Sequence, residues 1–596
     1  MKKRCLSALL AIVMVFAVVS LAQPSVSAAE MGATFTPGTY RGTSAGFGGP
    51  MTVEVTVSQN RIESVGFVSH FESMGFGDVA MAVLSDRIIR YQSLGVDYVA
   101  GATITSHAIT LAAMQALTEA AGEIPYQLLI PLQQAPLQQA PTENVDVVIV
   151  GSGLAGLMAA YELHFYHPEV SFIMLEQLDI LTGQLPTVGG TKHGPTSPLH
   201  TANDVAYTVD DLIGWFEYTS RAPQRHQLLR NVYSHSYEAF VRWLDWGATF
   251  EEDPILVQTV GDRDFHGFRH TGLGAGITEF FLNFIDANPM DVRAGNRATG
   301  LLVNNSGAVY GVTVQSRYAE YEIHAGAVLL ATGGFGYNQD LMEEFEPNWA
   351  AGAKGWARKA PGATGDGILF TRQFGTPIVG SGVIFGDIRP SIPFTTIPAP
   401  FIVATDGQRF INEDHAFQSV NSDNRNVIDI IEALGEGSKT AFRIADSELT
   451  IGALEARLDA GVLMQHDTLE DLAIARGIDV AAFLATVEAH NAAVAAGQSP
   501  GFGLPADVAR TIETAPFFSE LITPSFIGTI PGILVDDYLR VLDRNENPVP
   551  NLYAAGEVMF GNAFARIYPG SGTGIGFASY SGLYAARVML ADLGLN

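Results

Sequence analysis

The stretch Val147-Val-Ile-Val-Gly151-Ser152-Gly153-Leu-Ala155-Gly156 sets the fold of the larger part of this chain. An apolar run from Val145 leads into Gly151, as expected for a strand buried on both faces of a parallel sheet. Gly151 permits a tight turn, Gly153 lets the backbone approach a pyrophosphate, and Gly156 allows the next helix to pack closely. That helix directs its free N–H groups and positive dipole end at phosphates. The stretch therefore predicts a strand–turn–helix unit that binds a dinucleotide.

A second strand is predicted over 171–175, and it ends at Glu176-Gln177. An acidic residue about twenty positions after the glycine turn typically bonds the ribose hydroxyls of the dinucleotide. This segment alone leaves open whether the dinucleotide is a nicotinamide or a flavin cofactor.

Four later motifs favour the flavin. They are Ala327-Val-Leu-Leu-Ala-Thr332-Gly333-Gly-Phe335, Ala363-Thr-Gly-Asp366-Gly-Ile368, Asp406-Gly-Gln-Arg409-Phe-Ile-Asn-Glu413 and Asn551-Leu-Tyr-Ala-Ala-Gly556-Glu557. In this order they resemble the fumarate reductase/3-ketosteroid dehydrogenase superfamily of FAD enzymes, over about residues 145–590. The resemblance implies an α/β fold with a glutathione-reductase-type, Rossmann-like FAD domain. It also implies an inserted α+β cap domain over the isoalloxazine of non-covalently bound FAD.

The same resemblance assigns a set of FAD-binding residues. Gly183-Gln184 and Gly189-Gly190-Thr191 stand where the family has a GGN…GG pattern, although this stretch is shorter and degenerate. The full set is Gly151, Ser152, Gly153, Ala155, Gly156, Glu176, Gln177, Gly183, Gln184, Gly189, Gly190, Thr191, Thr332, Gly333, Asp366, Glu557, Gly572, Thr573 and Ile575.

A separate unit precedes the glycine turn, from about Ala33 to Gly122. Alternating Val53, Val55 and Val57 predict a half-buried strand, a second strand is expected over 62–68, and a helix over 106–117. Between the units lies Pro125–Pro141, where Pro-Leu-Gln-Gln-Ala occurs twice. Such a Pro- and Gln-rich segment predicts a semi-extended linker.

This first unit contains Tyr40-Arg-Gly42, His70-Phe-Glu72-Ser73 and Asp97-Tyr-Val-Ala-Gly101-Ala102-Thr103-Ile-Thr-Ser106. These segments resemble the small FMN-binding domain of sodium-pumping quinone reductase subunits and of some urocanate and fumarate reductases. The resemblance implies FMN esterified through its phosphate to Thr103 by a flavin transferase after export. Small Gly101 and Ala102 would admit the phosphate, and a helix starting at Ser106 would stabilise its charge. The alternative is an unmodified threonine that caps a helix.

The N-terminus predicts export. Met1-Lys-Lys-Arg4, an apolar run over 6–21 and Ser25-Val-Ser-Ala28-Ala29 are typical of a cleaved signal peptide, and an uncleaved anchor is the alternative. The one cysteine, Cys5, lies in this segment, so a cleaved chain would have no disulfide and no thiolate metal site. A net charge of -29 argues against nucleic acid as a partner. No residue spacing predicts a metal site.

The motifs divide the chain into six consecutive parts. They are a signal peptide (1–29), an FMN-binding domain (30–122), a linker (123–142), a first FAD-domain part (143–395), a cap that carries the substrate site (396–526) and a second FAD-domain part (527–596).

The catalytic residues are assigned by resemblance to two branches. The cationic residues and donors with which fumarate reductases clamp two carboxylates are missing near Thr396, Gly528–Gly532 and Ile567. Tyr568-Pro-Gly-Ser-Gly572 instead resembles the steroid dehydrogenase branch, where a tyrosine hydroxyl and a glycine N–H polarise a ketone. Tyr568 and Gly572 would then have these roles, unless Tyr568 is a buried structural residue.

The proton donor is left open, because the cap tyrosine of the steroid branch aligns with Phe417. His415, Arg389 and Arg425 are the candidates. His266 and His270 are expected in packing or a polar network.

The sequence therefore predicts an exported flavoprotein reductase. Electrons from a membrane or extracytoplasmic donor would pass from FMN to FAD, and then as hydride to a small-molecule acceptor with an activated C=C of the enone type. Three alternatives remain: a reductase of unsaturated carboxylates such as urocanate, fumarate or cinnamate, a 3-oxosteroid dehydrogenase, and an extracytoplasmic flavin electron carrier.

Overall fold

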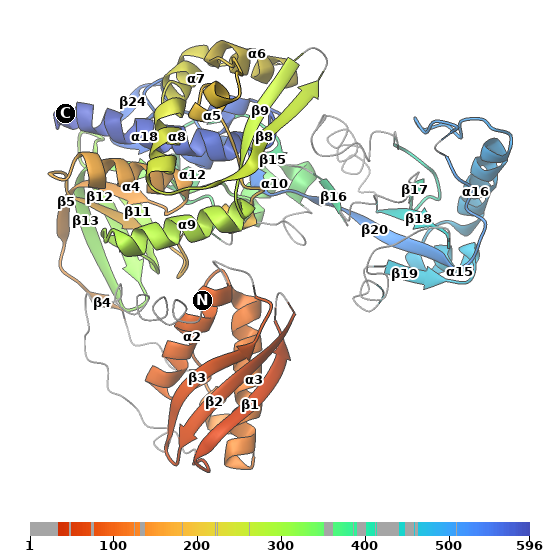
Figure 1. Ribbon diagram of the computed structural model, residues 1–596, viewed down its shortest axis with the longest axis horizontal. Helices are drawn as coiled ribbons and strands as arrows, with labels where there is room; N and C mark the ends of the chain where they lie inside the picture. Colours follow the sequence, from red (N-terminus) through yellow and green to blue (C-terminus); the bar gives the residue numbers. More distant parts are fainter. Residues whose placement is uncertain are drawn as a thin grey trace.

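The computed structural model describes residues 34–595 apart from short gaps and four longer ones, at 351–361, 390–400, 414–439 and 448–457. Three bodies of structure are visible in Figure 1. The N-terminal unit lies at the bottom, a larger α/β body lies above it, and a smaller lobe extends to the right. The α/β class that the motifs predict is confirmed.

The N-terminal unit is a three-stranded antiparallel sheet packed against two helices. Its elements are β1 (Gly38–Ala45), β2 (Pro50–Ser58), β3 (Arg61–Ser69), α2 (Gly77–Tyr91) and α3 (Thr103–Ala121). The predicted alternation is confirmed, because Val53, Val55 and Val57 are buried under the helices. A Cβ at Gly42 would lie 1.9 Å from the carbonyl oxygen of Ala112, so β1 and α3 meet at a point where only glycine fits.

One expectation for this unit was wrong: the helix begins at Thr103, not at Ser106. The chain turns into the helix directly after Gly101, whose φ is +101°. Ser106 instead uses its side-chain oxygen to accept a hydrogen bond from the N–H of Val99, at 3.1 Å, and so closes the preceding loop.

The α/β body is built on a nine-stranded sheet whose central strands are parallel. The parallel strands run in the order β10 (Val292–Arg293), β6 (Phe172–Leu175), β5 (Glu143–Val150), β13 (Ala319–Leu330) and β24 (Pro548–Ala554). Strands β11 (Asn296–Val303), β12 (Val309–Ser316) and β23 (Arg540–Leu542) add antiparallel partners, and β4 (Gln138–Gln139) pairs with the start of β13. The predicted strands at 145–150 and 171–175 are therefore present.

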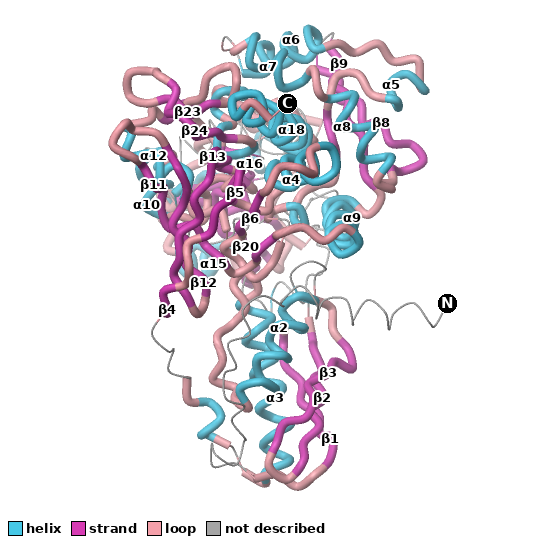
Figure 2. The backbone as a smooth tube through the Cα atoms, turned by 90° about the vertical axis from the view of Figure 1, so that its left-hand side faces the viewer, coloured by secondary structure: helices cyan, strands magenta, loops and turns pink. Residues whose placement is uncertain are grey.

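Helices cover this sheet. Helix α4 (Leu154–Tyr166), which follows the glycine turn, packs against the C-terminal helix α18 (Thr573–Leu593), as Figure 2 shows. A Cβ at Gly582 would lie 2.1 Å from the Ala155 carbonyl oxygen, so the two helices touch backbone to backbone. The other helices of the body are α5 (Pro198–Ala202), α6 (Val209–Ser220), α7 (His226–Tyr233), α8 (Ser236–Asp245), α9 (Leu273–Ala287), α10 (Gln339–Phe345), α12 (Asp366–Thr371) and α17 (Gly561–Phe564).

Short strands complete the body. The list is β7 (Thr191–His193), β8 (Phe250–Val260), β9 (Arg263–His270), β14 (Ile378–Val379), β15 (Val383–Ile384), β21 (Gly528–Thr529) and β22 (Gly532–Ile533).

The lobe has its own sheet and its own apolar cluster, centred on Phe401, Phe442 and Phe483. Its elements are β16 (Asp387–Arg389), β17 (Phe401–Ala404), β18 (Ala441–Ala445), β19 (Leu463–His466), α15 (Leu469–Arg476), α16 (Val480–Ala495) and β20 (Phe517–Ser525). Arg409 is buried in this lobe and pairs with the buried Glu413 at 2.6 Å. The ion pair gives Arg409 a structural role.

Candidate functional site

A large cavity lies at the carboxyl ends of the parallel strands. Val150, Leu175 and Leu330 are in register across three neighbouring strands, so the residues that follow them meet at one edge. Ligands of open α/β sheets bind at this edge. The cavity has about 1340 Å³ of empty space, its open mouth included, which is ample for a dinucleotide. Every residue of the FAD-binding set lines it except Ser152, Gly156 and Thr573.

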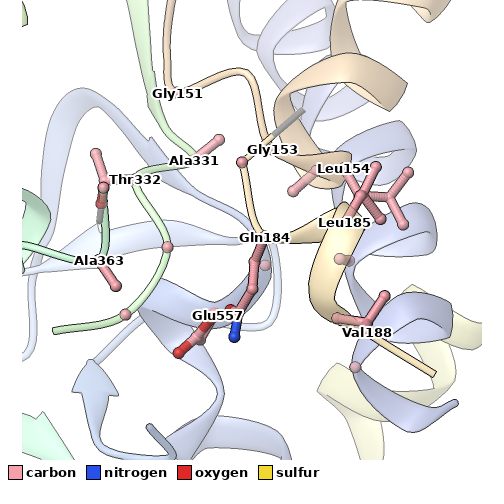
Figure 3. Close-up of a pocket in the computed structure, with 18 of the residues that line it drawn as sticks. Gly151, Gly153, Leu154, Gln184, Leu185, Val188, Ala331, Thr332, Ala363 and Glu557 are labelled. Carbon is pink, nitrogen blue, oxygen red and sulfur yellow. The ribbon is translucent and has the colours of Figure 1, made fainter. Parts of the chain in front are cut away.

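The glycine turn forms one wall (Figure 3). A Cβ at Gly151 would lie 2.3 Å from the Ala331 carbonyl oxygen, and one at Gly156 would lie 2.0 Å from the Gly151 carbonyl oxygen. These two glycines are therefore required by packing. A Cβ at Gly153 would meet no atom within 4 Å. That position faces open space at the N-terminus of α4, where a pyrophosphate would receive the helix dipole.

Glu176 lies beside this turn and is buried. Its carboxylate accepts hydrogen bonds from the Ser152 N–H and hydroxyl, at 3.1 and 2.8 Å, and from the Leu178 N–H at 2.9 Å. Burial raises the pKa of Glu176 despite these donors. The carboxyl group thus fixes the turn in addition to lining the cavity.

Thr332 and Glu557 also line the cavity. In the part of the chain that the structure describes, the buried Thr332 hydroxyl has no hydrogen-bond partner. Glu557 accepts from the Thr529 N–H at 2.8 Å, and burial raises its pKa to about 7. A buried hydroxyl and a carboxyl that is partly protonated at neutral pH both suit a polar ligand in the cavity.

One residue of the cavity wall, Arg297 on β11, is not marked by any sequence pattern. Its guanidinium makes two hydrogen bonds to Asp366, at 2.7 and 3.1 Å. Asp366 is buried and Arg297 is half-exposed. A single arginine on a strand belongs to no recognisable motif. Arg297 is identified as a wall residue only by the structure, which places β11 beside the cavity. Among the lining residues that the structure describes, Arg297 is the only lysine or arginine.

These features fit FAD. Gly151, Gly153 and the start of α4 would hold its pyrophosphate, Glu176 its adenosine ribose, and Thr332 and Glu557 further polar groups of the cofactor. When bound, FAD supplies hydride chemistry to the site.

Tyr568 and Gly572 also line the cavity. The Tyr568 hydroxyl oxygen accepts a hydrogen bond from the Gly574 N–H at 2.7 Å, and burial raises the pKa of Tyr568. The hydroxyl therefore stays protonated at neutral pH. Gly572 has a φ of +89°, and a Cβ there would lie 2.8 Å from the Thr191 carbonyl oxygen.

The proton-donor candidates are not brought together by the described residues. The backbone of Arg389 lies in β16 and pairs with Thr523, while its side chain lies outside the described part. His415, Phe417, Arg425 and Thr396 are also outside it.

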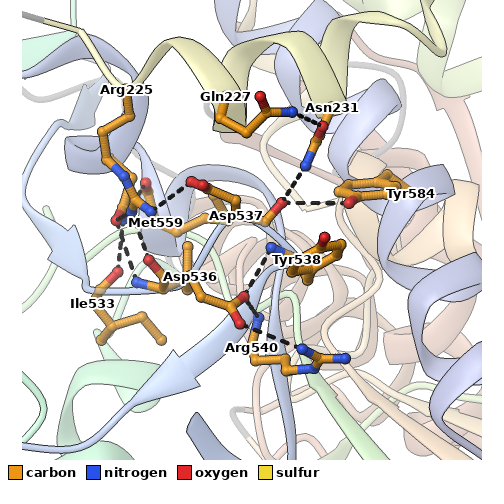
Figure 4. Close-up of polar contacts among 12 residues, drawn as sticks. Arg225, Gln227, Asn231, Ile533, Asp536, Asp537, Tyr538, Arg540, Met559 and Tyr584 are labelled. Atoms are coloured by element: carbon orange, nitrogen blue, oxygen red, sulfur yellow. Dashed lines mark hydrogen bonds and ion pairs between the residues drawn. The ribbon is translucent and has the colours of Figure 1, made fainter. Parts of the chain in front are cut away.

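The segment between β22 and β23 has a structural role (Figure 4). Asp536 accepts hydrogen bonds from the Tyr538 and Arg540 N–H groups, and Asp543 accepts from the backbone of the turn that follows it. Arg225 joins this region to α7 through the Val535 carbonyl and the Asp537 carboxylate. The network positions the loop between β22 and β23.

A second candidate site lies in the N-terminal unit. Thr103 is exposed in the first turn of α3, next to the buried Ala102. Phe71, Tyr98 and Ile104 are exposed apolar residues in the segments around it, and Thr105 donates a 2.5 Å hydrogen bond to Glu72 that ties two of these segments together. A reachable hydroxyl at a helix start, with apolar side chains nearby, fits an attached flavin phosphate.

The described residues contain no group of three His, Cys, Asp or Glu side chains placed to hold a metal ion. In the same residues, no helix combines the length and apolarity needed to cross a bilayer. His266 packs against His200 and Tyr207 in a buried cluster of rings.

Comparison with known families identifies the cofactor that the cavity binds. A family described as FAD binding domain matches residues 146–575, and one described as FMN-binding domain matches residues 46–118. The chain belongs to the FAD-binding family. The resemblance carried by the motifs is thereby confirmed, and the protein is an FAD-dependent oxidoreductase acting on CH–CH groups, with an FMN-binding domain at its N-terminus.

Two relatives match most of the chain. The chain is 26% identical to an NADH:acrylate oxidoreductase of Vibrio harveyi over 88% of its own length, but it spans only 59% of that protein. It is 25% identical to a urocanate reductase of Eggerthella lenta, over 87% of each chain. Among solved structures, an open flavocytochrome c3 fumarate reductase superposes with a TM-score of 0.60 at 25% identity, covering 76% of this chain and 79% of the other.

We predict that Gly153→Val weakens FAD binding without unfolding the protein. A Cβ at this position lies in the space at the start of α4 and meets no protein atom within 4 Å. FAD affinity should fall by at least about tenfold, equivalent to ~1.4 kcal/mol. Flavin titration and circular dichroism measure the two effects. Gly66→Val is the control, since a Cβ there also has free space, with the nearest atom at 3.9 Å. Equal FAD affinity in the two variants would contradict the assignment.

We predict that stability falls as pH rises toward neutrality, in part because of Glu346. This carboxylate accepts the Gly382 N–H at 2.5 Å, and burial raises its pKa from 4.5 to about 7. The folded state then binds more protons than the unfolded state between these values, so the contribution is complete below about pH 4.5 and is lost as pH rises through about 7.

Glu346→Gln keeps the acceptor and should reduce the fall in melting temperature between about pH 5 and 8. The exposed Glu119→Gln serves as the control. An identical fall in both variants would refute the role of Glu346.

Proposed function

We propose that this protein is an exported flavoprotein reductase with FMN attached covalently at Thr103. It passes electrons from FMN to FAD, and from FAD to a C=C bond conjugated to a carbonyl group. The observation that carries the proposal is one chain with an FMN-binding domain and an FAD cavity joined to a separate lobe. A dedicated electron input of this kind favours reduction over dehydrogenation.

Names of the relatives support an unsaturated carboxylate as the acceptor. Two of these names contain acrylate and urocanate, and both compounds have a C=C bond conjugated to a carboxylate. We therefore give this class precedence over free enones. The fumarate-type clamp is absent at Gly528–Gly532, where the chain forms β21 and β22, so an acid with one carboxylate fits better than a diacid.

Tyr568 would polarise the acceptor. Reduction of the C=C bond adds a hydride to the carbon distal to the carbonyl and a proton to the carbon beside it. Negative charge develops on the carbonyl oxygen between these steps, and a protonated hydroxyl in a buried cavity stabilises such charge. The raised pKa of Tyr568 keeps its hydroxyl in this protonated form.

The proposal also includes export and maturation of the protein. The protein would be cleaved near Ala28-Ala29, flavinylated by a flavin transferase and reduced by a membrane or extracytoplasmic donor. The segment 1–33 lies outside the described residues.

We predict that protein from the native host carries one FMN that survives denaturation. Its mass should exceed that of the chain starting after Ala28 or Ala29 by one FMN less one water, and tryptic mapping should place the adduct on the peptide with Thr103. Thr103→Val should lack the adduct, while the neighbouring Thr105→Val should retain it. An unmodified Thr103 in the native host would disprove covalent attachment.

We predict that acrylate or urocanate reoxidises the photoreduced protein under anaerobic conditions. Fumarate, cyclohexenone and a 3-oxosteroid complete the panel, and reoxidation without any small acceptor would indicate an electron carrier. Tyr568→Phe should slow the reoxidation about 10²-fold at unchanged FAD content, as loss of an oxyanion donor does. Tyr584→Phe is the control, because that hydroxyl donates to the Asp537 backbone carbonyl and Tyr584 is not among the described residues that line the cavity (Figure 4). Equal rates in the two variants would remove Tyr568 from the mechanism.

A further inference from the structure

The segment 176–180 connects the two flavin sites physically. Its first residues, Glu176 to Leu178, line the FAD cavity. Leu178 and Ile180 are also buried in the apolar cluster of the N-terminal unit, together with Val99 and Ala102. Leu178 therefore has the FAD cavity on one side and the FMN-attachment loop, residues 97–103, on the other.

Asp179 holds that loop. Its carboxylate pairs with the Arg87 guanidinium at 3.0 Å and accepts the Ala100 N–H at 3.3 Å. The same guanidinium donates to the carbonyl oxygens of Asp97 and Tyr98, at 2.9 and 3.2 Å. Arg87 and Asp179 are 12% and 22% exposed, so the pair is largely shielded from solvent. One carboxylate of the FAD domain thus fixes the loop three residues before Thr103.

The end of the β12–β13 hairpin provides a second contact. Arg317 pairs with Asp97 at 2.7 Å, and the hydroxyls of Tyr318 and Tyr91 lie 2.6 Å apart. These residues come from a different part of the FAD domain than Asp179 does. The loop is held from two directions, which fixes its orientation as well as its position.

We propose that Asp179 and Arg317 form a latch that docks the FMN-attachment loop on the wall of the FAD cavity, in the arrangement in which electrons pass between the flavins. This inference rests on the proposed function. Each transfer removes two electrons and two protons from reduced FMN and adds two electrons and two protons to FAD.

The character of the interface suits a contact that opens and closes. Its described contacts include two ion pairs, the hydrogen bond from the Ala100 N–H, one pair of tyrosines and two aliphatic residues, and polar contacts of this kind are typical of weak electron-transfer interfaces. The linker between the units compensates for the weakness, because a short tether raises the effective concentration to the millimolar range. The latch then selects one docked orientation out of those that the linker allows.

Hydrogen–deuterium exchange on the flavin-loaded protein tests the docking. In Asp179→Ala and in Arg317→Ala, amides of 97–106 and 176–181 should exchange at least about threefold faster than in the unaltered protein, while β2 exchanges as before. Unchanged β2 amides show that the unit has undocked and has not unfolded. Asp210→Ala is the control, because it breaks an exposed ion pair with Arg230 on the outer helices. Equal exchange in the latch and control variants would overturn the latch.

Rapid mixing tests the consequence. Protein photoreduced at both flavins is mixed anaerobically with the acceptor, acrylate or urocanate, that oxidises it faster. FAD should reoxidise first, and a second phase should report its re-reduction by FMN. Asp179→Ala should slow the second phase by about tenfold or more and leave the first unchanged. An unchanged second phase would overturn the link between docking and electron transfer. If neither acid oxidises the protein, the proposed function and the link between docking and electron transfer both fail. The hydrogen–deuterium exchange experiment then still tests whether the latch docks the loop.

Discussion

The close approach of the glycine turn to its neighbours is the constraint on which the rest of the structure depends. Strands β5, β6 and β13 end in register, and backbone bonds continue past their ends, from the Gly151 N–H to the Leu175 carbonyl and from the Ala331 N–H to the Val150 carbonyl. The clearance at Gly151 and Gly156 leaves no room for a side chain. Because the turn is fixed this tightly, α4 starts at one defined place, and its N-terminus points into the cavity.

The charge of the cavity follows from the same constraint. Phosphates of the cofactor would bind there through backbone N–H groups and the helix dipole, so the site needs few cations, and a chain with a net charge of -29 can still hold an anionic cofactor. Of the carboxyl groups that line the cavity, Asp366 is paired with Arg297, and burial raises the pKa of Glu176 and of Glu557. Burial thus reduces the negative charge that the cofactor would meet.

Local patterns predicted much of this protein, and contacts between distant segments account for what they missed. The strand with Val53, Val55 and Val57 and the turn at Gly151 depend on spacing within a few residues, and both are present. Arg297 and Asp179 act through partners 69 and 92 positions away, and no periodicity marks such pairs. The start of α3 was misplaced because Ser106, a good capping residue by type, bonds back to Val99. The proton donor stays undetermined because the candidates depend on how the lobe presents side chains to the cavity.

The lobe and the N-terminal unit are both attached to the α/β body that contains the FAD cavity. The lobe joins the α/β body through β16 and β20, where Arg389 is in register with Thr523, and β20 continues from there into the sheet of the lobe. The N-terminal unit joins through the linker and through Asp179 and Arg317. Leu178 beside the N-terminal unit and Ile527, two residues after the end of β20, both line the FAD cavity, so each smaller body is attached next to that cavity. If electrons pass from FMN to FAD as proposed, they would enter past Leu178 and the acceptor would be reduced near Tyr568, since both residues line that cavity.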